Sequence, residues 1–190
     1  MPSAVQRLFD TCKDVFADVG SGAVPSPADV ERLRSVLDTL KPQDVGLSRN
    51  LPLFKHASTN RPPAVTYLHL SAFPNFSLLL GKSAGACLAK VNTDAVFKAP
   101  CETSVLYPTT GGNIHRFTAV TPCAVLDVLV PPYNDNEGRA CTYYEEHAYL
   151  SFPVPGAGDG DYVWLEAMAS EPEELVVRGS QYTGPEIVEY

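Results

Sequence analysis

Apolar residues recur at steps of three and four near the start of the chain, a spacing that gathers side chains on one face of an α-helix. The stripe predicts a helix over residues 4–16, and its members are Val5, Leu8, Phe9, Cys12, Val15 and Phe16. Such a face far more often packs on its own domain than on a partner helix. We therefore expect this helix to cover part of the core.

A second helix is marked by the residues that begin and end it. Ser26 can cap the helix, Pro27 suits its first turn, and Asp29 completes an S-x-x-D capping box. Pro42 ends it, because proline cannot continue a helix. The apolar stripe in between comprises Val30, Leu33, Val36, Leu37 and Leu40. The sequence thus predicts two helices before any strand.

The hydrophobic period changes to two beyond a polar, proline-containing connection over residues 46–63. Short runs rich in β-branched and aromatic residues follow, and turn-forming residues separate them, as is typical of strands. The predicted strands are 65–70, 104–107, 113–120, 123–130, 162–165 and 175–182, with a hairpin turn at 108–112 and loops at 134–146 and 153–161. The chain is therefore expected to be mainly β, with two N-terminal helices.

Two of the predicted strands carry a polar side chain on an otherwise apolar face. Alternation in 113–120 places His115 on the same face as Phe117 and Ala119. In 123–130, Asp127 shares its face with three apolar residues, Cys123, Val125 and Leu129. Burying an unpaired carboxylate is costly, so we expect Asp127 to be paired or solvated from a cavity.

Composition and charge narrow the class of protein. The 190 residues, 45% of them hydrophobic and 19% charged, suit one soluble globular domain. No apolar run approaches the roughly 18 residues that cross a bilayer, and the N-terminus lacks a signal-peptide core, so we expect a protein of the cytoplasm or nucleus without membrane contact. Residues 1–133 hold 12 Lys+Arg and 10 Asp+Glu, whereas residues 134–190 hold 2 and 12. This acidic surface argues against nucleic-acid binding.

The five cysteines are widely scattered, odd in number and free of any CxxC pair: Cys12, Cys87, Cys101, Cys123 and Cys141. This spacing argues against a disulfide framework, and we expect reduced thiols. A mixed zinc site with His115 is an alternative that the ligand spacing does not favour.

The four histidines are His56, His69, His115 and His147. From the residues alone, His115 fits either a hydrogen-bonded core histidine or a metal ligand. Asp127 fits either a buried carboxylate that accepts from backbone amides or a functional acid. We expect His56 and His147 to be solvated loop residues and His69 a hydrogen-bonded strand residue.

Residues 104–133, SVLYPTTGGNIHRFTAVTPCAVLDVLVPPY, resemble the C-terminal half of the plant cysteine oxidases and of their animal relative, 2-aminoethanethiol dioxygenase. YPTTGGNIHRF is similar to the turn and strand that carry the family's third iron ligand, which falls on His115. LDVLVPPY is similar to the strand whose acid and tyrosine line the substrate pocket, here Asp127 and Tyr133. Further agreement lies at 40–47 (LKPQDVGL), 62–70 (PPAVTYLHL), 141–143 (CTY) and 181–187 (QYTGPEI).

The resemblance implies a cupin-type barrel, a double-stranded β-helix, which is incomplete here. Residues 1–45 would be a helical segment packed on the barrel, and residues 46–190 a truncated cupin-like thiol dioxygenase domain. The implied activity is that of an oxidoreductase which uses Fe(II), held by three neutral imidazoles, and O₂ to oxidise a cysteine thiol to a sulfinic acid. The implied substrate is the N-terminal cysteine of a peptide or protein, as in oxygen sensing, and the enzyme is expected to be a monomer. Asp127 would engage the substrate amine or orient a water, and Tyr133 would donate a hydrogen bond near the oxygen site.

The chain departs from the family between residues 70 and 88. The family has several strands there with a His-x-His pair in a PLH-x-HP motif, whereas this chain has only SAFPNFSLLLGKSAGAC. One family ligand position, His115, is left, and replacement by His56, His69 or His147 would require accurate ligand placement. We therefore predict impaired activity and, because lost strands expose edges, a less stable or partly molten fold. The alternatives are a non-catalytic isoform that binds or competes for substrates, and an unproductive splice product.

Overall fold

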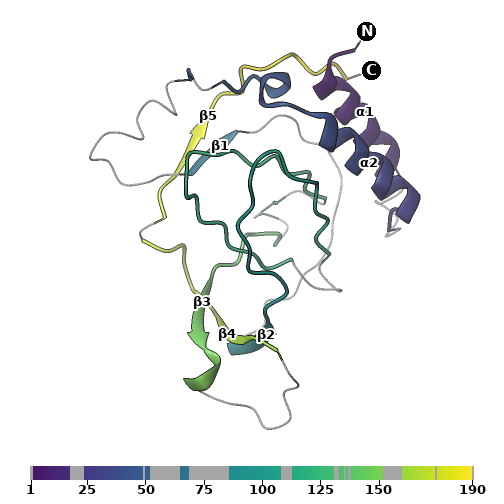
Figure 1. Cartoon of the computed structure of the whole chain (residues 1–190). Coiled ribbons are helices and arrows are strands. Elements are labelled where there is room, and N and C mark those ends of the chain that lie inside the picture. The colour runs from purple at the N-terminus through teal and green to yellow at the C-terminus, as the bar shows by residue number, and fades with distance from the viewer. Residues whose placement is uncertain are drawn as a thin grey trace.

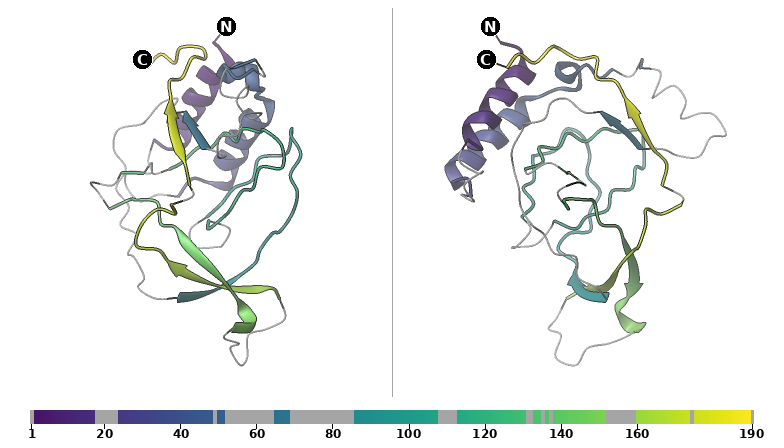
Figure 2. Two further views of the ribbon diagram at one scale, coloured as in Figure 1. Left: turned by 90° about the vertical axis from the view of Figure 1, so that its left-hand side faces the viewer. Right: turned by 180° about the vertical axis from the view of Figure 1, so that it is seen from behind.

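The computed structural model describes residues 2–17, 24–48, 50–51, 65–68, 86–107, 113–130, 133–134, 136, 138–151, 160–173 and 175–189, with the backbone alone described for 65–68 and 151. The two α-helices lie at one end of the molecule, next to both termini, and a three-stranded sheet lies at the other end (Figure 1). The described residues 91–107 and 113–130 run between these ends without helix or strand (Figures 1 and 2).

Both predicted helices are present, and α2 begins at the cap that the sequence predicted, Ser26. Helix α1 covers Ala4–Val15, and the side chain of Ser3 accepts a hydrogen bond from the backbone N–H of Gln6 at 3.1 Å. Helix α2 covers Pro27–Thr39, and the Ser26 hydroxyl accepts from the backbone N–H of Asp29 at 3.1 Å. A short 3₁₀ helix, η2, follows over Pro42–Val45. In the described part of the chain, the helices are too short and too polar to cross a bilayer.

The buried core of the described residues lies between the two helices. The cluster contains Leu8, Cys12, Val15 and Leu33, and Leu126 and Val128 of the middle segment pack against it. Burial removes the Cys12 thiolate from water and raises the pKa of this thiol from its ordinary value to about 12. The stripe periodicity that predicted the helices thus also identified their buried face.

The C-terminal tail is fixed to the helical end of the molecule. Gln6 of α1 accepts from the backbone N–H of Val188 at 2.8 Å and donates to the Val188 carbonyl at 2.9 Å. Four residues before Val188, the tail also approaches Gly46, which has a φ of 74°: a Cβ atom at position 46 would lie 2.5 Å from the Cα atom of Gly184. Only glycine fits so close to the tail with this backbone conformation.

The described strands form two open sheets. Strand β1 (Val65–Leu68) pairs in parallel with β5 (Val177–Ser180). Strand β4 (Tyr162–Ala167) is the central strand of the second sheet, and it pairs antiparallel with β2 (Ala86–Lys90) on one side and with β3 (Tyr144–Ala148) on the other. A short 3₁₀ turn, η5 (Tyr149–Ser151), follows β3. Figure 2 shows the three-stranded sheet from two further sides.

The structure corrects several of the strand predictions. The runs 65–70 and 175–182 contain β1 and β5, and β4 continues two residues beyond the run 162–165. The described residues of 104–107, 113–120 and 123–130 form no strand. Strand β2 was not predicted, and β3 begins inside a predicted loop, 134–146. A strand needs a hydrogen-bonding partner, which an alternating pattern cannot supply. The predicted hairpin turn at 108–112 lies outside the described residues.

Candidate active-site residues

His115 is the candidate metal ligand on which the sequence argument depends. Its Nδ1 atom lies 3.0 Å from the backbone carbonyl oxygen of Asn113. A carbonyl oxygen can only accept, so Nδ1 carries a proton and donates, and in the neutral ring the lone pair is then on Nε2. The ring also contacts Phe117, with 5.1 Å between the ring centroids. This arrangement fixes the tautomer in which Nε2 can bind a metal, as is common for histidine ligands.

Asp127 lies in a segment whose side chains alternate between the helical core and solvent. Leu126 and Val128 are partly buried against the α1 and α2 cluster, whereas Val125, Asp127 and Leu129 are exposed. The predicted common face of Asp127 and its apolar neighbours is therefore present, although the segment is not a strand. The Asp127 side chain is exposed at the surface. It therefore differs from the expected carboxylate that is paired or solvated from a cavity, because the segment around it is not buried in a sheet.

The remaining predicted pocket residue, Tyr133, is also exposed. It precedes a turn closed by an isolated bridge between Asn134 and Arg139, in which Gly138 has a φ of 74°. Beyond the turn, Tyr143 donates to a Glu171 oxygen at 3.3 Å. Partial burial, with further contributions from Cys141 and Glu171, raises the pKa of the Tyr143 hydroxyl.

His147 does not occupy the predicted solvated loop. It is a partly buried residue of β3, and its Nε2 atom lies 3.2 Å from an Oε atom of Glu166 on the neighbouring strand β4. The loop prediction for 134–146 extended to within one residue of it, and the EEH sequence gave no strand propensity to reveal the partner. His56 and His69 lie outside the described residues.

The described residues do not fit a metal centre. No three His, Cys, Asp or Glu side chains among them are arranged to hold a metal ion. His115 is in a segment of the middle of the chain, whereas His147 is bound to Glu166 on the three-stranded sheet. A single imidazole with a fixed tautomer supplies one ligand, and a three-ligand iron site needs two more.

The sequence is similar to known thiol-oxidising enzymes over nearly its whole length. It is 43% identical to plant cysteine oxidase 2 of Arabidopsis thaliana over 230 aligned residues, which cover 97% of this chain and 83% of the relative. The corresponding identity to plant cysteine oxidase 1 of the same plant is 37%, over 97% and 80% of the two chains. The mouse 2-aminoethanethiol dioxygenase is 24% identical over 99% and 98%.

The first alignment is longer than the part of this chain that it covers. Because 97% of 190 residues is about 184, about 46 of the 230 aligned positions have no counterpart here. The chain therefore lacks a substantial internal part of what this relative has.

The PCO_ADO family model matches residues 79–187, which is more than half of the chain. This segment includes His115, Asp127 and Tyr133. Together with the 43% identity to a plant cysteine oxidase, the match shows that the chain belongs to the PCO_ADO family of thiol dioxygenases.

Proposed function

We propose that this chain descends from an enzyme that oxidises the N-terminal cysteine of peptides or proteins, and that its own turnover is strongly reduced. In the family reaction, both atoms of O₂ are added to a thiol, which becomes a sulfinic acid. The observation that carries the proposal is the donor set: His115 supplies one imidazole, and the described residues bring no second and third ligand to it.

Two retained residues support the substrate assignment. By family resemblance, Asp127 engages the amine of an N-terminal cysteine or orients a water, and Tyr133 donates a hydrogen bond near the oxygen site. Both side chains are exposed and can meet a peptide terminus. The proposal includes an iron-dependent, cupin-type ancestor and a monomeric protein of the cytoplasm or nucleus that takes part in oxygen sensing.

The proposal also accounts for the open sheets. A barrel that loses a segment between residues 70 and 88 leaves its neighbouring runs without strand partners. The unpaired runs 113–120 and 123–130 agree with such a loss, and so do the aligned positions that have no counterpart here. We propose residues 1–45 as the helical segment and 46–190 as the shortened domain.

The test is a graft. Residues 71–87 are replaced by the segment that plant cysteine oxidase 2 has between the flanking matches, and the native chain and the graft are compared. The measurements are iron content, oxygen uptake and a mass gain of two oxygen atoms on a Cys-initiated peptide. We expect the native chain to be at least about 100-fold slower than the graft, since loss of inner ligands exceeds the usual effect of losing their supporting residues.

His115→Ala provides the matched control. In the graft it should abolish iron retention and oxidation, whereas in the native chain it should change neither, because the proposal gives the native chain only one of the three iron ligands. Stoichiometric iron and full turnover in the native chain would overturn the proposal.

A non-catalytic binding role is the second candidate, and the exposure of Asp127 and Tyr133 favours it. A Cys-initiated peptide should then bind the native chain more tightly than the same peptide with an acetylated amine. Asp127→Asn should weaken the binding of the free-amine peptide about tenfold, as for loss of a charge-assisted hydrogen bond. Equal affinities for the free and acetylated peptides would eliminate this role.

A further inference from the structure

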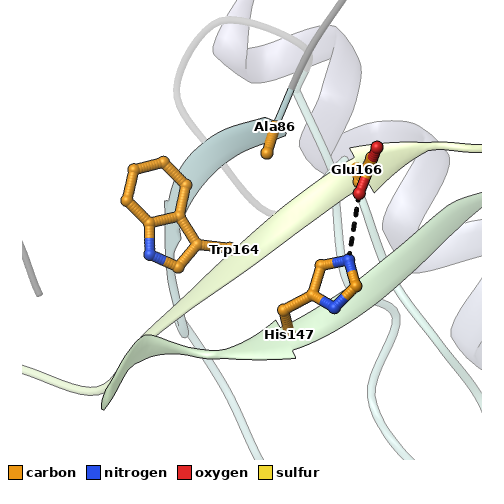
Figure 3. A pocket seen from close by; sticks show the side chains of 4 residues that line it. All are labelled: Ala86, His147, Trp164 and Glu166. Carbon is orange, nitrogen blue, oxygen red and sulfur yellow. Dashed lines mark hydrogen bonds and ion pairs between the residues drawn. The ribbon is translucent and has the colours of Figure 1, made fainter. Parts of the chain in front are cut away.

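A pocket of about 240 Å³ lies on the three-stranded sheet and is lined by Ala86, His147, Trp164 and Glu166. Its residues come from all three strands, β2, β3 and β4. Figure 3 shows the Trp164 indole at one side of the pocket and the hydrogen-bonded pair of His147 and Glu166 at the other. None of these residues is among those that resemble the family's iron or substrate site.

The strand register explains why these side chains meet. Trp164 and Glu166 are two residues apart on β4, so they point to the same face of the sheet. His147 is directly opposite Trp164 on β3, and Ala86 is directly opposite Glu166 on β2. The small side chain of Ala86 leaves space over β4, and the larger groups around it form the walls.

The charge on this face of the sheet is mainly negative. Glu145 is directly opposite Glu166 in the register of β3 and β4, which puts a second carboxylate on the same face. Lys90 is at the far end of β2, where its side chain lies close to Gly160 and pairs in register with Tyr162. Residues 134–190 as a whole hold 12 acidic and 2 basic residues. Such a surface attracts cations and repels anions.

We propose that this pocket binds a primary alkylammonium ion, either a small amine or a lysine-like side chain. The ammonium group donates to the Glu166 carboxylate, which has acceptor capacity beyond its bond to His147. The alkyl stem lies against Ala86 and the indole face of Trp164, where the positive charge is also attracted by the aromatic ring. The site is independent of His115, Asp127 and Tyr133.

Trp164 is the only tryptophan of the chain, so its fluorescence reports on the pocket directly. The chain is titrated with n-butylammonium, and n-butanol and butyrate are the uncharged and anionic controls of the same length. We expect a saturable change in emission with n-butylammonium, and at least tenfold higher concentrations of n-butanol for the same change. Equal responses to n-butylammonium and n-butanol would overturn the proposal without any mutant.

A matched pair of variants locates the charge that matters. Glu166→Gln keeps the shape of the side chain and removes its charge, and Glu186→Gln removes the same charge from the exposed C-terminal tail at the helical end. We expect about tenfold weaker binding for Glu166→Gln and less than a twofold change for Glu186→Gln. Unchanged binding in Glu166→Gln, or equal weakening in both variants, would show that the pocket does not select the cation. Circular dichroism of each variant checks that the sheet is retained.

Discussion

The helical end of the molecule and the segment 113–130 are both rich in apolar residues, but they differ sharply in burial. In the helices, Leu8 is 6% exposed and Leu33 is 8% exposed. In the middle segment, Phe117 and Val125 are each 60% exposed, and Val120 is 83% exposed. The difference in burial therefore reflects the packing partners that each region has, and not its composition.

The comparison indicates which kind of structure can form without distant partners, as the proposed loss of an internal segment requires. A helix satisfies its backbone hydrogen bonds within itself, so α1 and α2 need only each other and a few neighbours to bury their stripes. A strand obtains its hydrogen bonds from another strand, which has to be present elsewhere in the sequence. The segment 113–130 keeps its alternating pattern of apolar residues. Of these residues, Leu126 and Val128 pack against the helical core.

The largest expected effect comes from shortening a buried side chain of the helices, and the same change at an exposed side chain of 113–130 is the comparison. Leu8→Ala should lower the free energy of unfolding of the helical region by about 2–5 kcal/mol, because it leaves a cavity in a buried cluster. Phe117→Ala removes a larger side chain but should change it by less than about 0.5 kcal/mol, because the ring is already exposed to solvent. Urea unfolding followed by circular dichroism measures both.

A large loss of stability in Phe117→Ala would contradict the comparison. It would mean that 113–130 is packed in solution, either within one chain or between copies. Sedimentation at two protein concentrations would separate those cases, since only contacts between copies depend on concentration.

The sequence was most informative where structure depends on neighbours along the chain. The predicted cap residue Ser26 begins α2, and the stripes of both helices correctly indicated the buried faces. The predictions failed for 104–107, 113–120 and 123–130, because strand formation there depends on residues that the chain lacks or that lie far away. Strand β3 was missed for the converse reason: its polar sequence YEEHA pairs because β4 is beside it.

The candidate site was predictable only through its resemblance to a family. Short family motifs identified His115, Asp127 and Tyr133 as candidates, and the segment matched by the family model includes all three. Their positions as ligand and pocket residues remain predictions, which the graft tests. The pairing of His147 with Glu166 depends on the register of β3 and β4, and the two residues are 19 positions apart in the sequence. No local pattern carries such information.

The next largest effect should come from the contact that joins the two ends of the chain. Gln6→Ala removes the acceptor for the Val188 N–H and the donors to the Val188 carbonyl and Asp10, and we expect it to cost about 1–3 kcal/mol. Gln181→Ala, at an exposed position on the same tail, is the control and should change stability by less than about 0.5 kcal/mol. Amide hydrogen exchange at residues 186–189 should accelerate in the first variant alone. Unchanged exchange in Gln6→Ala would show that other contacts hold the tail.

A smaller effect should appear in the pH dependence of the helical core. The folded-state pKa of Cys12 is raised to about 12, whereas an unfolded thiol titrates near its ordinary value. The stability that the neutral, buried thiol provides is thus complete below the unfolded pKa and is lost as pH rises toward the folded one. Above pH ~9 the loss should approach about 1.4 kcal/mol per pH unit. Cys12→Ala lacks this contribution, so the stability difference between native chain and variant should shrink with rising pH. A constant difference would show that the thiol is hydrated.

The smallest expected effect tests the N-cap of α2. The Ser26 hydroxyl accepts from the backbone N–H of Asp29, so Ser26→Ala leaves a helix-terminal donor without its partner and should cost about 1 kcal/mol. Ser35, inside the same helix, donates to the carbonyl of Glu31 at 2.9 Å, a carbonyl that the helix itself can satisfy. Ser35→Ala should therefore be neutral or slightly stabilising, because alanine has the higher helix propensity. If both substitutions cost the same in thermal unfolding, the helix would depend on its packing and not on its cap. Our explanation that α2 forms through local interactions, whereas the segment 113–130 needs distant partners, would then be wrong.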